Sequence, residues 1–218
     1  MPLAQVEKIT DSGRGLKHLI LQVPTEVTAE YRTPGQYVVL SQGEEKSFFA
    51  IASAPNDAGL HLLVKDQPGL AARICALQPG EEIECSPAQG KGFQLDEGRD
   101  THLFSMGSGI SPFRALIEHH INGGFKSSGL TLWQGCLDRE HLPFSEDIAR
   151  WESQGINIKL CFDREGDVVE NVRQRLVREA PDLVGALAFW IGSKDFGSEV
   201  KDAAVNLGLK TDDYRSNY

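Results

Sequence analysis

The stretch THLFSMGSGISP, Thr101 to Pro112, decides the fold of this 218-residue chain. Its first half, Thr101 to Met106, predicts a compact apolar strand, and its second half predicts a glycine-bearing turn that enters a helix at Pro112. That helix is expected to be amphipathic, because apolar residues recur at helical spacing: Phe113, Leu116, Ile117 and Ile121. A strand that passes through a tight turn into such a helix is typical of an α/β fold.

The pattern continues toward the C-terminus. Three further apolar strands are predicted at Leu130 to Gln134, Ile156 to Phe162 and Ala186 to Ile191. Helices are predicted between and after them, at Ser145 to Glu152, Val168 to Arg178 and Ser198 to Leu207. Strands that alternate with helices predict a doubly wound parallel sheet.

The N-terminal half has a different rhythm. It is a series of short β-prone runs separated by turns: Leu16 to Val23, Gln36 to Ser41, Phe48 to Ser53, Leu60 to Lys65 and Glu82 to Ser86. This spacing predicts a sandwich or a small barrel, with one short helix at Leu70 to Leu77. The rhythm changes in the polar segment Asp96 to Asp100, so we predict two domains, residues 1–97 and 98–218.

Composition excludes several classes. Asp and Glu outnumber Lys and Arg, 31 to 22, and the net charge of −9 argues against a nucleic-acid partner held by phosphate neutralisation. No apolar stretch is long enough to span a membrane and no basic leader is visible, so a cytoplasmic location is expected. The four cysteines share no C-x-x-C spacing, which predicts reduced thiols and no metal site: Cys75, Cys85, Cys136 and Cys161.

Glycine-bearing strand ends are the candidate binding residues of the second half. In the turn after the first strand, glycines allow a close backbone approach, and the following helix N-terminus suits a pyrophosphate: Gly107, Ser108, Gly109, Ile110, Ser111 and Pro112. A second strand end carries Gly192, Ser193, Lys194 and Phe196, and a third carries Gly135. The alternative is that each is an ordinary strand–helix turn that binds nothing.

A further candidate lies in the first half, where the strand ending at Val64 and Lys65 leads to a short helix with small residues at its mouth: Gly69, Leu70, Ala71 and Ala72. This segment predicts a second phosphate cradle, with a plain turn as the alternative. No G-x-S-x-G elbow is present, so hydrolase chemistry is disfavoured.

Taken together, these motifs resemble the ferredoxin–NADP reductase superfamily. Pro34 to Val38 is similar to the family's Pro-Gly-Gln-Tyr strand, Phe49 to Ser53 to its flavin segment, Gly69 to Ala72 to its Gly-x-x-Ser stretch, and Gly107 to Pro112 to its nicotinamide-dinucleotide loop. Gly90 to Phe93 resembles a loop of the branch that holds kiwi-fruit reductase-like proteins and the dihydroorotate dehydrogenase electron-transfer subunit.

The resemblance implies an N-terminal antiparallel β-barrel that binds FAD, followed by a doubly wound parallel-sheet domain that binds NAD(P). It implies a flavin-dependent oxidoreductase that passes hydride from NAD(P)H to FAD and then to a small molecule or a separate redox protein. FAD would contact Phe49, Ala50, Ile51 and Ala52, and Tyr218 would stack on the flavin or form a frayed tail. Hydride transfer of this kind requires no general acid–base pair, so no catalytic residue is assigned.

Several family residues are replaced. Ser47 stands where the family has an arginine, Ala50 and Ala72 stand where it has hydroxyl residues, and Ile191 stands where it has a cysteine. After Gly135 the chain has Asp138, a carboxylate that would repel a 2′-phosphate, which favours NAD over NADP. The alternative function is therefore a degenerate, non-catalytic member of the fold that binds a nucleotide or a partner.

Overall fold

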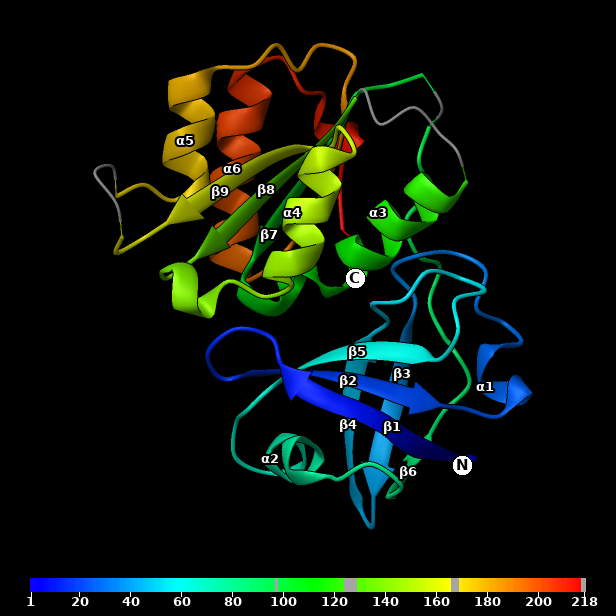
Figure 1. Cartoon of the computed structure of the whole chain (residues 1–218). Coiled ribbons are helices and arrows are strands. Elements are labelled where there is room, and N and C mark those ends of the chain that lie inside the picture. The colour runs from blue at the N-terminus through cyan, green and yellow to red at the C-terminus, as the bar shows by residue number, and fades with distance from the viewer. Residues whose placement is uncertain (97, 124–128, 166–168, 217–218) are drawn as a thin grey trace. The chain divides into compact units, whose positions relative to one another are not determined.

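The computed structural model describes residues 1–96, 98–123, 129–165 and 169–216, and the chain forms two compact units (Figure 1). The first unit contains Met1–Phe93 together with Ser111–Gly123, and the second contains Gln94–Ile110 together with Gly124–Ser216. Helix α3 (Ser111–Asn122) therefore belongs to the first unit, although it follows a strand of the second. The boundary between residues 97 and 98 stays a prediction.

The first unit is built on a six-stranded sheet in which every paired strand is antiparallel. The order is β4-β3-β6-β1-β2-β5, and a bridge between Ile51 and Leu62 joins the chain after β4 to β5. This closure confirms the barrel. Its strands are β1 (Leu3–Asp11), β2 (Leu16–Gln22), β3 (Tyr37–Gln42), β4 (Glu45–Ala50), β5 (Leu60–Lys65) and β6 (Glu82–Cys85). Two short helices accompany them, α1 (Thr25–Thr28) and α2 (Leu70–Ala76).

Strand β1 is absent from the strands predicted from the sequence. Ala4 and Val6 are buried, but the pairing with β2 shifts its register between Val6 and Lys8. This irregularity interrupts the two-residue alternation that identifies a strand, since an extra residue moves the following side chains to the other face.

The second unit holds a five-stranded parallel sheet in the order β11-β10-β7-β8-β9, which confirms the doubly wound prediction. Helices α5 and α6 cover one face and α4 covers the other (Figure 1). The strands are β7 (Thr101–Met106), β8 (Leu130–Cys136), β9 (Asn157–Phe162), β10 (Leu187–Ile191) and β11 (Tyr214–Arg215). The helices are α4 (Ser145–Ser153), α5 (Val172–Glu179) and α6 (Lys194–Asn206), with 3-10 turns at Gly107–Ile110, Arg139–His141 and Thr211–Asp213.

Two helix boundaries differ from the prediction because side chains cap the helices. Helix α6 starts at Lys194, four residues before the predicted Ser198, because the Ser193 hydroxyl accepts a hydrogen bond from the Phe196 N–H at 3.2 Å. Helix α5 starts at Val172 behind a capping box formed by Asn171 and Gln174.

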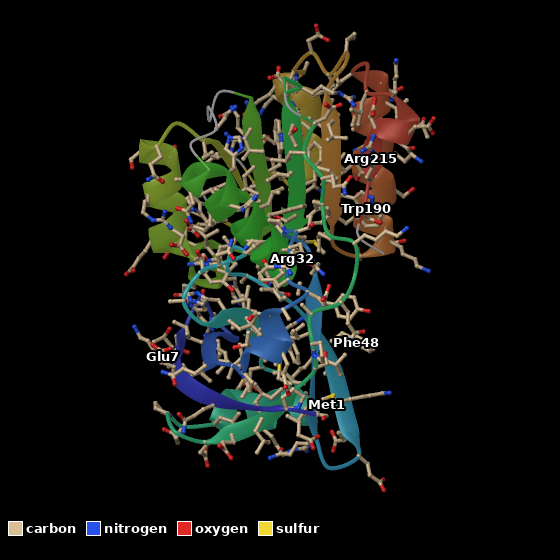
Figure 2. The ribbon with its side chains drawn as sticks, turned by 90° about the vertical axis from the view of Figure 1, so that its right-hand side faces the viewer. Met1, Glu7, Arg32, Phe48, Trp190 and Arg215 are labelled. Carbon is tan, nitrogen blue, oxygen red and sulfur yellow. The ribbon has the colours of Figure 1, made fainter. Side chains whose placement is uncertain are left out.

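Aromatic side chains pack densely on one face of the parallel sheet. Trp190 stacks on Tyr214 with ring centroids 6.0 Å apart, and Trp190 is marked in Figure 2. The Tyr214 hydroxyl donates a hydrogen bond to the Gly197 carbonyl of α6 at 2.9 Å. A Cβ at Gly197 would lie 2.4 Å from the Trp190 ring, so α6 approaches β10 only because this residue is glycine. Short strand β11 is thereby held at the edge of the sheet.

His102 is buried at the start of β7. Its Nδ1 lies 3.0 Å from the Trp133 indole Nε1, which can only donate, so Nδ1 is the acceptor and the imidazole is neutral. Burial lowers the pKa of His102 from 6.5 to about 4, while Asp100 acts in the opposite direction.

Within the described residues, no helix is both long and apolar enough to cross a membrane.

This buried histidine makes stability depend on pH. Since its folded pKa of about 4 lies below the unfolded value of 6.5, its contribution is complete above pH 6.5 and is lost as the pH falls toward 4. The loss amounts to about 3 kcal/mol. Urea titrations followed by tryptophan fluorescence measure it in the second unit, because Trp133, Trp151 and Trp190 all lie there. The variant H102Q keeps an acceptor for Trp133 but does not titrate, so an equal acid sensitivity in this variant would contradict the assignment.

Candidate functional site

Three glycine-bearing strand ends meet at one edge of the parallel sheet. Strand β7 lies between β10 and β8, and the register pairs Ile191 with Ser105 and Met106 with Gly135. Gly107, Gly135 and Gly192 therefore follow or end neighbouring strands at the same carboxyl edge. The chain continues from β7 to β8 on one side and reaches β10 on the other, so this is the point where strand order reverses. Open parallel sheets bind ligands at such a point.

The glycines at this edge differ in what surrounds them. Gly107 has a φ of +54°, and no atom lies within 4 Å of where its Cβ would be. A Cβ at Gly109 would lie 2.7 Å from the Ile191 carbonyl oxygen, and one at Gly192 would lie 2.6 Å from the Phe196 ring. Gly109 and Gly192 are therefore required for packing, whereas Gly107 borders open space, as a turn that approaches a ligand would.

The remaining residues of these loops also have defined places. Lys194 and Phe196 belong to the first turn of α6, and Lys194 is exposed. Ile110 is buried at the end of its 3-10 turn, and Ser108 is half-buried.

A buried glutamine, which the sequence analysis did not select, supports the Gly107 turn. Gln134 of β8 has no exposed surface; its Oε1 accepts a hydrogen bond from the Ser105 hydroxyl, and its Nε2 lies 3.1 Å from the Gly107 carbonyl oxygen. Nε2 also lies 3.0 Å from the Gly135 carbonyl oxygen and 3.3 Å from the Cys136 sulfur. The available signal was a polar residue inside an otherwise apolar strand.

Helix α3, which belongs to the first unit, is hydrogen-bonded to the barrel. The Ser111 hydroxyl donates to the Ala50 carbonyl at 3.0 Å, and Arg114 Nη1 donates to the Ala52 carbonyl at 2.8 Å. Pro112 and Phe113 are buried in the same turn, and the Phe113 ring lies 5.3 Å from that of Phe93. Arg114 does not belong to the apolar stripe of this helix, yet the structure buries it, and its guanidinium is satisfied by a barrel carbonyl.

Strand β4 presents two neighbouring phenylalanines on opposite faces. Phe49 pairs across the sheet with the fully buried Val38 and packs against the barrel core. Phe48 is 65% exposed and makes an edge contact with Tyr37, with centroids 5.7 Å apart; it is labelled in Figure 2. Ile51 and Ala52 are fully buried. Phe48 is thus the aromatic side chain that faces solvent on this strand.

The second predicted cradle lies beside an ion pair. Gly69 has a φ of +98°, and the place of its Cβ is 3.7 Å from a Glu45 carboxylate oxygen. The other Glu45 oxygen lies 2.8 Å from Arg73, which also donates to the Gln42 side chain at 3.0 Å. Of the other predicted residues here, Val64, Leu70 and Ala71 are buried, Ala72 is half-buried and Lys65 is exposed. The predicted contact at Tyr218 lies outside the described residues.

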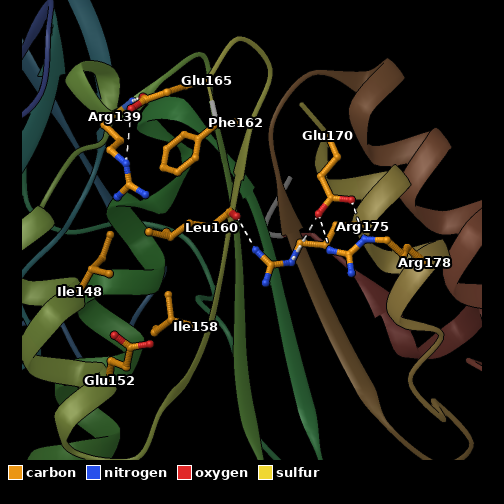
Figure 3. A pocket seen from close by; sticks show the side chains of 10 residues that line it. All are labelled: Arg139, Ile148, Glu152, Ile158, Leu160, Phe162, Glu165, Glu170, Arg175 and Arg178. Carbon is orange, nitrogen blue, oxygen red and sulfur yellow. Dashed lines mark hydrogen bonds and ion pairs between the residues drawn. The ribbon is translucent and has the colours of Figure 1, made fainter. Parts of the chain in front are cut away.

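A separate cavity of about 400 Å³ follows the edge strand β9 (Figure 3). Arg175 donates to the Leu160 carbonyl, and Glu170 pairs with Arg178, which holds the pKa of Glu170 below its usual range. These contacts cover the unpaired edge of the sheet. No predicted site residue lines this cavity, whose wall is formed by Arg139, Ile148, Glu152, Ile158, Leu160, Phe162, Glu165, Glu170, Arg175 and Arg178.

The titratable groups near these loops include a buried thiol and a histidine–aspartate pair. In the part of the chain that is described, no cluster of three or more His, Cys, Asp or Glu residues could hold a metal ion. Burial raises the pKa of the Cys136 thiol to about 11, so it stays protonated and unreactive. Asp138 accepts a hydrogen bond from His141, with its oxygen 2.6 Å from Nδ1, and this contact lowers the pKa of Asp138.

Comparisons with known proteins agree with this architecture. The FAD/NAD-binding domain of a nitric oxide dioxygenase from Vibrio cholerae superposes with a TM-score of 0.86 and 19% identity, covering 99% of this chain and 98% of that one. The H286L mutant of Plasmodium falciparum ferredoxin–NADP⁺ reductase gives a TM-score of 0.82 and 14% identity, covering 99% and 94%. The chain thus has the ferredoxin–NADP reductase-like two-domain fold.

The curated relatives that match this chain are longer than it. The NADPH-dependent diflavin oxidoreductase 1 of Debaryomyces hansenii is 25% identical over 95% of this chain and 38% of its own length. The sulfhydrogenase 2 subunit gamma of Pyrococcus furiosus is 23% identical over 75% of this chain and 58% of its own length. The chain therefore spans less than two thirds of either relative. No protein-family model matches it.

The two faces of β4 give a stability prediction. Replacing Phe49 by Ala removes side-chain packing from the barrel core and is expected to lower the free energy of unfolding by about 2–3 kcal/mol. The matched variant F48A, one residue away, removes an exposed ring and is expected to change it by less than about 0.5 kcal/mol. Urea unfolding followed by far-ultraviolet circular dichroism measures both. Equal losses would contradict the assignment of faces.

Proposed function

We propose that this protein is an FAD-containing, NAD(P)H-dependent reductase. The observation that carries the proposal is the edge of the parallel sheet, where Gly107, Gly135 and Gly192 meet at the reversal of strand order. The second support is the closed antiparallel barrel, whose residues 49–53 resemble a flavin-binding segment.

In this proposal NAD(P)H binds at the carboxyl edge of the sheet. Backbone N–H groups of the Gly107–Pro112 turn face its phosphates, and Lys194, exposed at the start of α6, adds positive charge beside Gly192. FAD binds at the barrel, against residues 49–52, 64–65 and 69–72. Once bound, the nicotinamide and the flavin supply the hydride chemistry, while the chain supplies their position and surroundings.

NADH is the proposed donor. The Asp138 carboxylate follows the strand end at Gly135 and stays ionised, because its bond to His141 lowers its pKa. A fixed negative charge there disfavours the additional phosphate of NADPH. The diflavin relative is described as NADPH-dependent, so the proposed preference differs from the one in that relative's name.

The electron acceptor is proposed to be a small molecule or a separate redox protein. Two of the curated relatives are named as an oxidoreductase and as a sulfhydrogenase subunit, which supports transfer of electrons to another component. The kiwi-fruit and dihydroorotate dehydrogenase branch and the cytoplasmic location remain predictions.

One observation favours the alternative, a member of the fold that no longer uses flavin. Glu45 places a carboxylate beside Gly69, where the resemblance puts the flavin pyrophosphate, and it pairs with Arg73. A carboxylate at this position repels a phosphate unless Arg73 exchanges one partner for the other.

The visible spectrum of the purified protein decides between the two functions. We expect flavin absorption after incubation with FAD, and we expect it to bleach on addition of NADH faster than on addition of NADPH. Protein that stays colourless with excess FAD would support the non-catalytic alternative. A flavin spectrum that neither nucleotide changes would contradict reductase activity.

The Glu45–Arg73 pair gives a prediction about FAD affinity. Replacing Glu45 by Gln removes a negative charge beside the cradle and releases Arg73 for a phosphate, so FAD should bind about two- to five-fold more tightly. Fluorescence titration of the apoprotein with FAD measures this. The control E44Q changes the net charge equally at the neighbouring exposed position, and an equal gain in that variant would contradict a local effect.

A further inference from the structure

The buried side-chain amide of Gln134 forms hydrogen bonds to a neighbouring strand, to the Gly107 turn and to its own backbone. It accepts from Ser105 on β7, donates toward Gly107 in the turn, and lies against the backbone of its own strand. A buried amide is costly unless its hydrogen bonds are satisfied, and an apolar side chain of similar volume would avoid that cost. The neighbouring positions of β8 are apolar, such as Leu132 and Trp133. This arrangement points to a role at the turn.

The hydrogen bond to Gly107 fixes the orientation of one peptide group. In a trans peptide the C=O and the following N–H point in opposite directions, and the chain contains no cis peptide bond among the described residues. When the Gly107 carbonyl points inward to Gln134, the Ser108 N–H points away from it. No atom lies within 4 Å of the place of a Gly107 Cβ, so the turn is open to a ligand on that side.

We propose that Gln134 is a positioning residue for dinucleotide binding: by holding the Gly107 carbonyl inward, it aims the Ser108 N–H at the pyrophosphate. The inference rests on the proposed function, since it assigns the nucleotide to this edge of the sheet. Without the amide donor, the Gly107–Ser108 peptide is free to rotate, and glycine at position 107 makes that rotation inexpensive. The anion then meets a donor that is not preorganised, which weakens binding.

Two variants separate this role from a general effect on stability. Q134M has nearly the same length and volume but no donor for Gly107. S105A is the matched control, because it breaks the other hydrogen bond of the same amide and leaves the donor to Gly107 in place. Q134M removes all hydrogen bonds of the amide, whereas S105A removes only the one from Ser105, so Q134M is expected to lower stability more. Tryptophan fluorescence in urea measures both losses, and binding is compared where both variants are folded.

The binding experiment uses ADP-ribose, which carries the pyrophosphate without the nicotinamide, in calorimetric titration of the full chain. We expect Q134M to bind about ten-fold more weakly and S105A to stay within about two-fold of the unmodified protein. The FAD affinity of Q134M should be unchanged, and in turnover assays its KM for NADH should rise while kcat is kept. Unchanged ADP-ribose affinity in Q134M, or an equal loss in S105A, would overturn the inference.

Failure of the proposed function gives a different result. If the unmodified protein binds neither ADP-ribose nor NADH, the nucleotide assignment fails. Whether Gln134 orients the turn through its hydrogen bond to Gly107 is then tested by ¹H–¹⁵N spectra recorded without ligand. The amide signals of residues 107–110 should shift or broaden in Q134M and stay in place in S105A, and unchanged signals in Q134M would overturn that part as well.

Discussion

The parallel pairing of β7 with both β8 and β10 is the constraint on which the rest of the second unit depends. It places the first strand of the α/β half in the middle of its sheet, so that three strand ends meet at one edge. The close approach of Gly109 to the Ile191 carbonyl, which a side chain would block, allows the turn after β7 to lie against β10. A site at this edge follows from how the strands are ordered.

Helix α3 extends that constraint into the first unit. Its N-terminus continues the Gly107 turn, while Ser111 and Arg114 bond the carbonyls of Ala50 and Ala52. Both side chains are buried, and a buried guanidinium is stable only where acceptors satisfy it. The helix therefore belongs to the barrel by packing and to the parallel sheet by sequence.

Buried polar side chains form hydrogen bonds between neighbouring elements of the second unit. His102 accepts from Trp133, and Gln134 donates to Gly107. Within the described part of the chain, no buried side-chain nitrogen or oxygen lacks a hydrogen-bond partner. Each of these groups costs free energy to bury, and its hydrogen bonds offset that cost only in one arrangement of the surrounding strands.

The amino-acid sequence by itself determined the two kinds of sheet, because two-residue alternation and strand–helix alternation are local patterns. It also identified the glycine-bearing strand ends, since glycine at a strand end is visible without a structure. It did not reveal strand β1, whose alternation is broken by a register shift after Val6, or the early start of α6 behind Ser193. Tertiary structure alone decided that Phe49 faces the barrel core while Phe48 faces solvent, that Glu45 lies beside Gly69, and that Gln134 reaches the Gly107 carbonyl. The reason is the same in each case: these contacts join residues that are far apart in the chain or depend on the face of a strand, and both are set only when the strands pair.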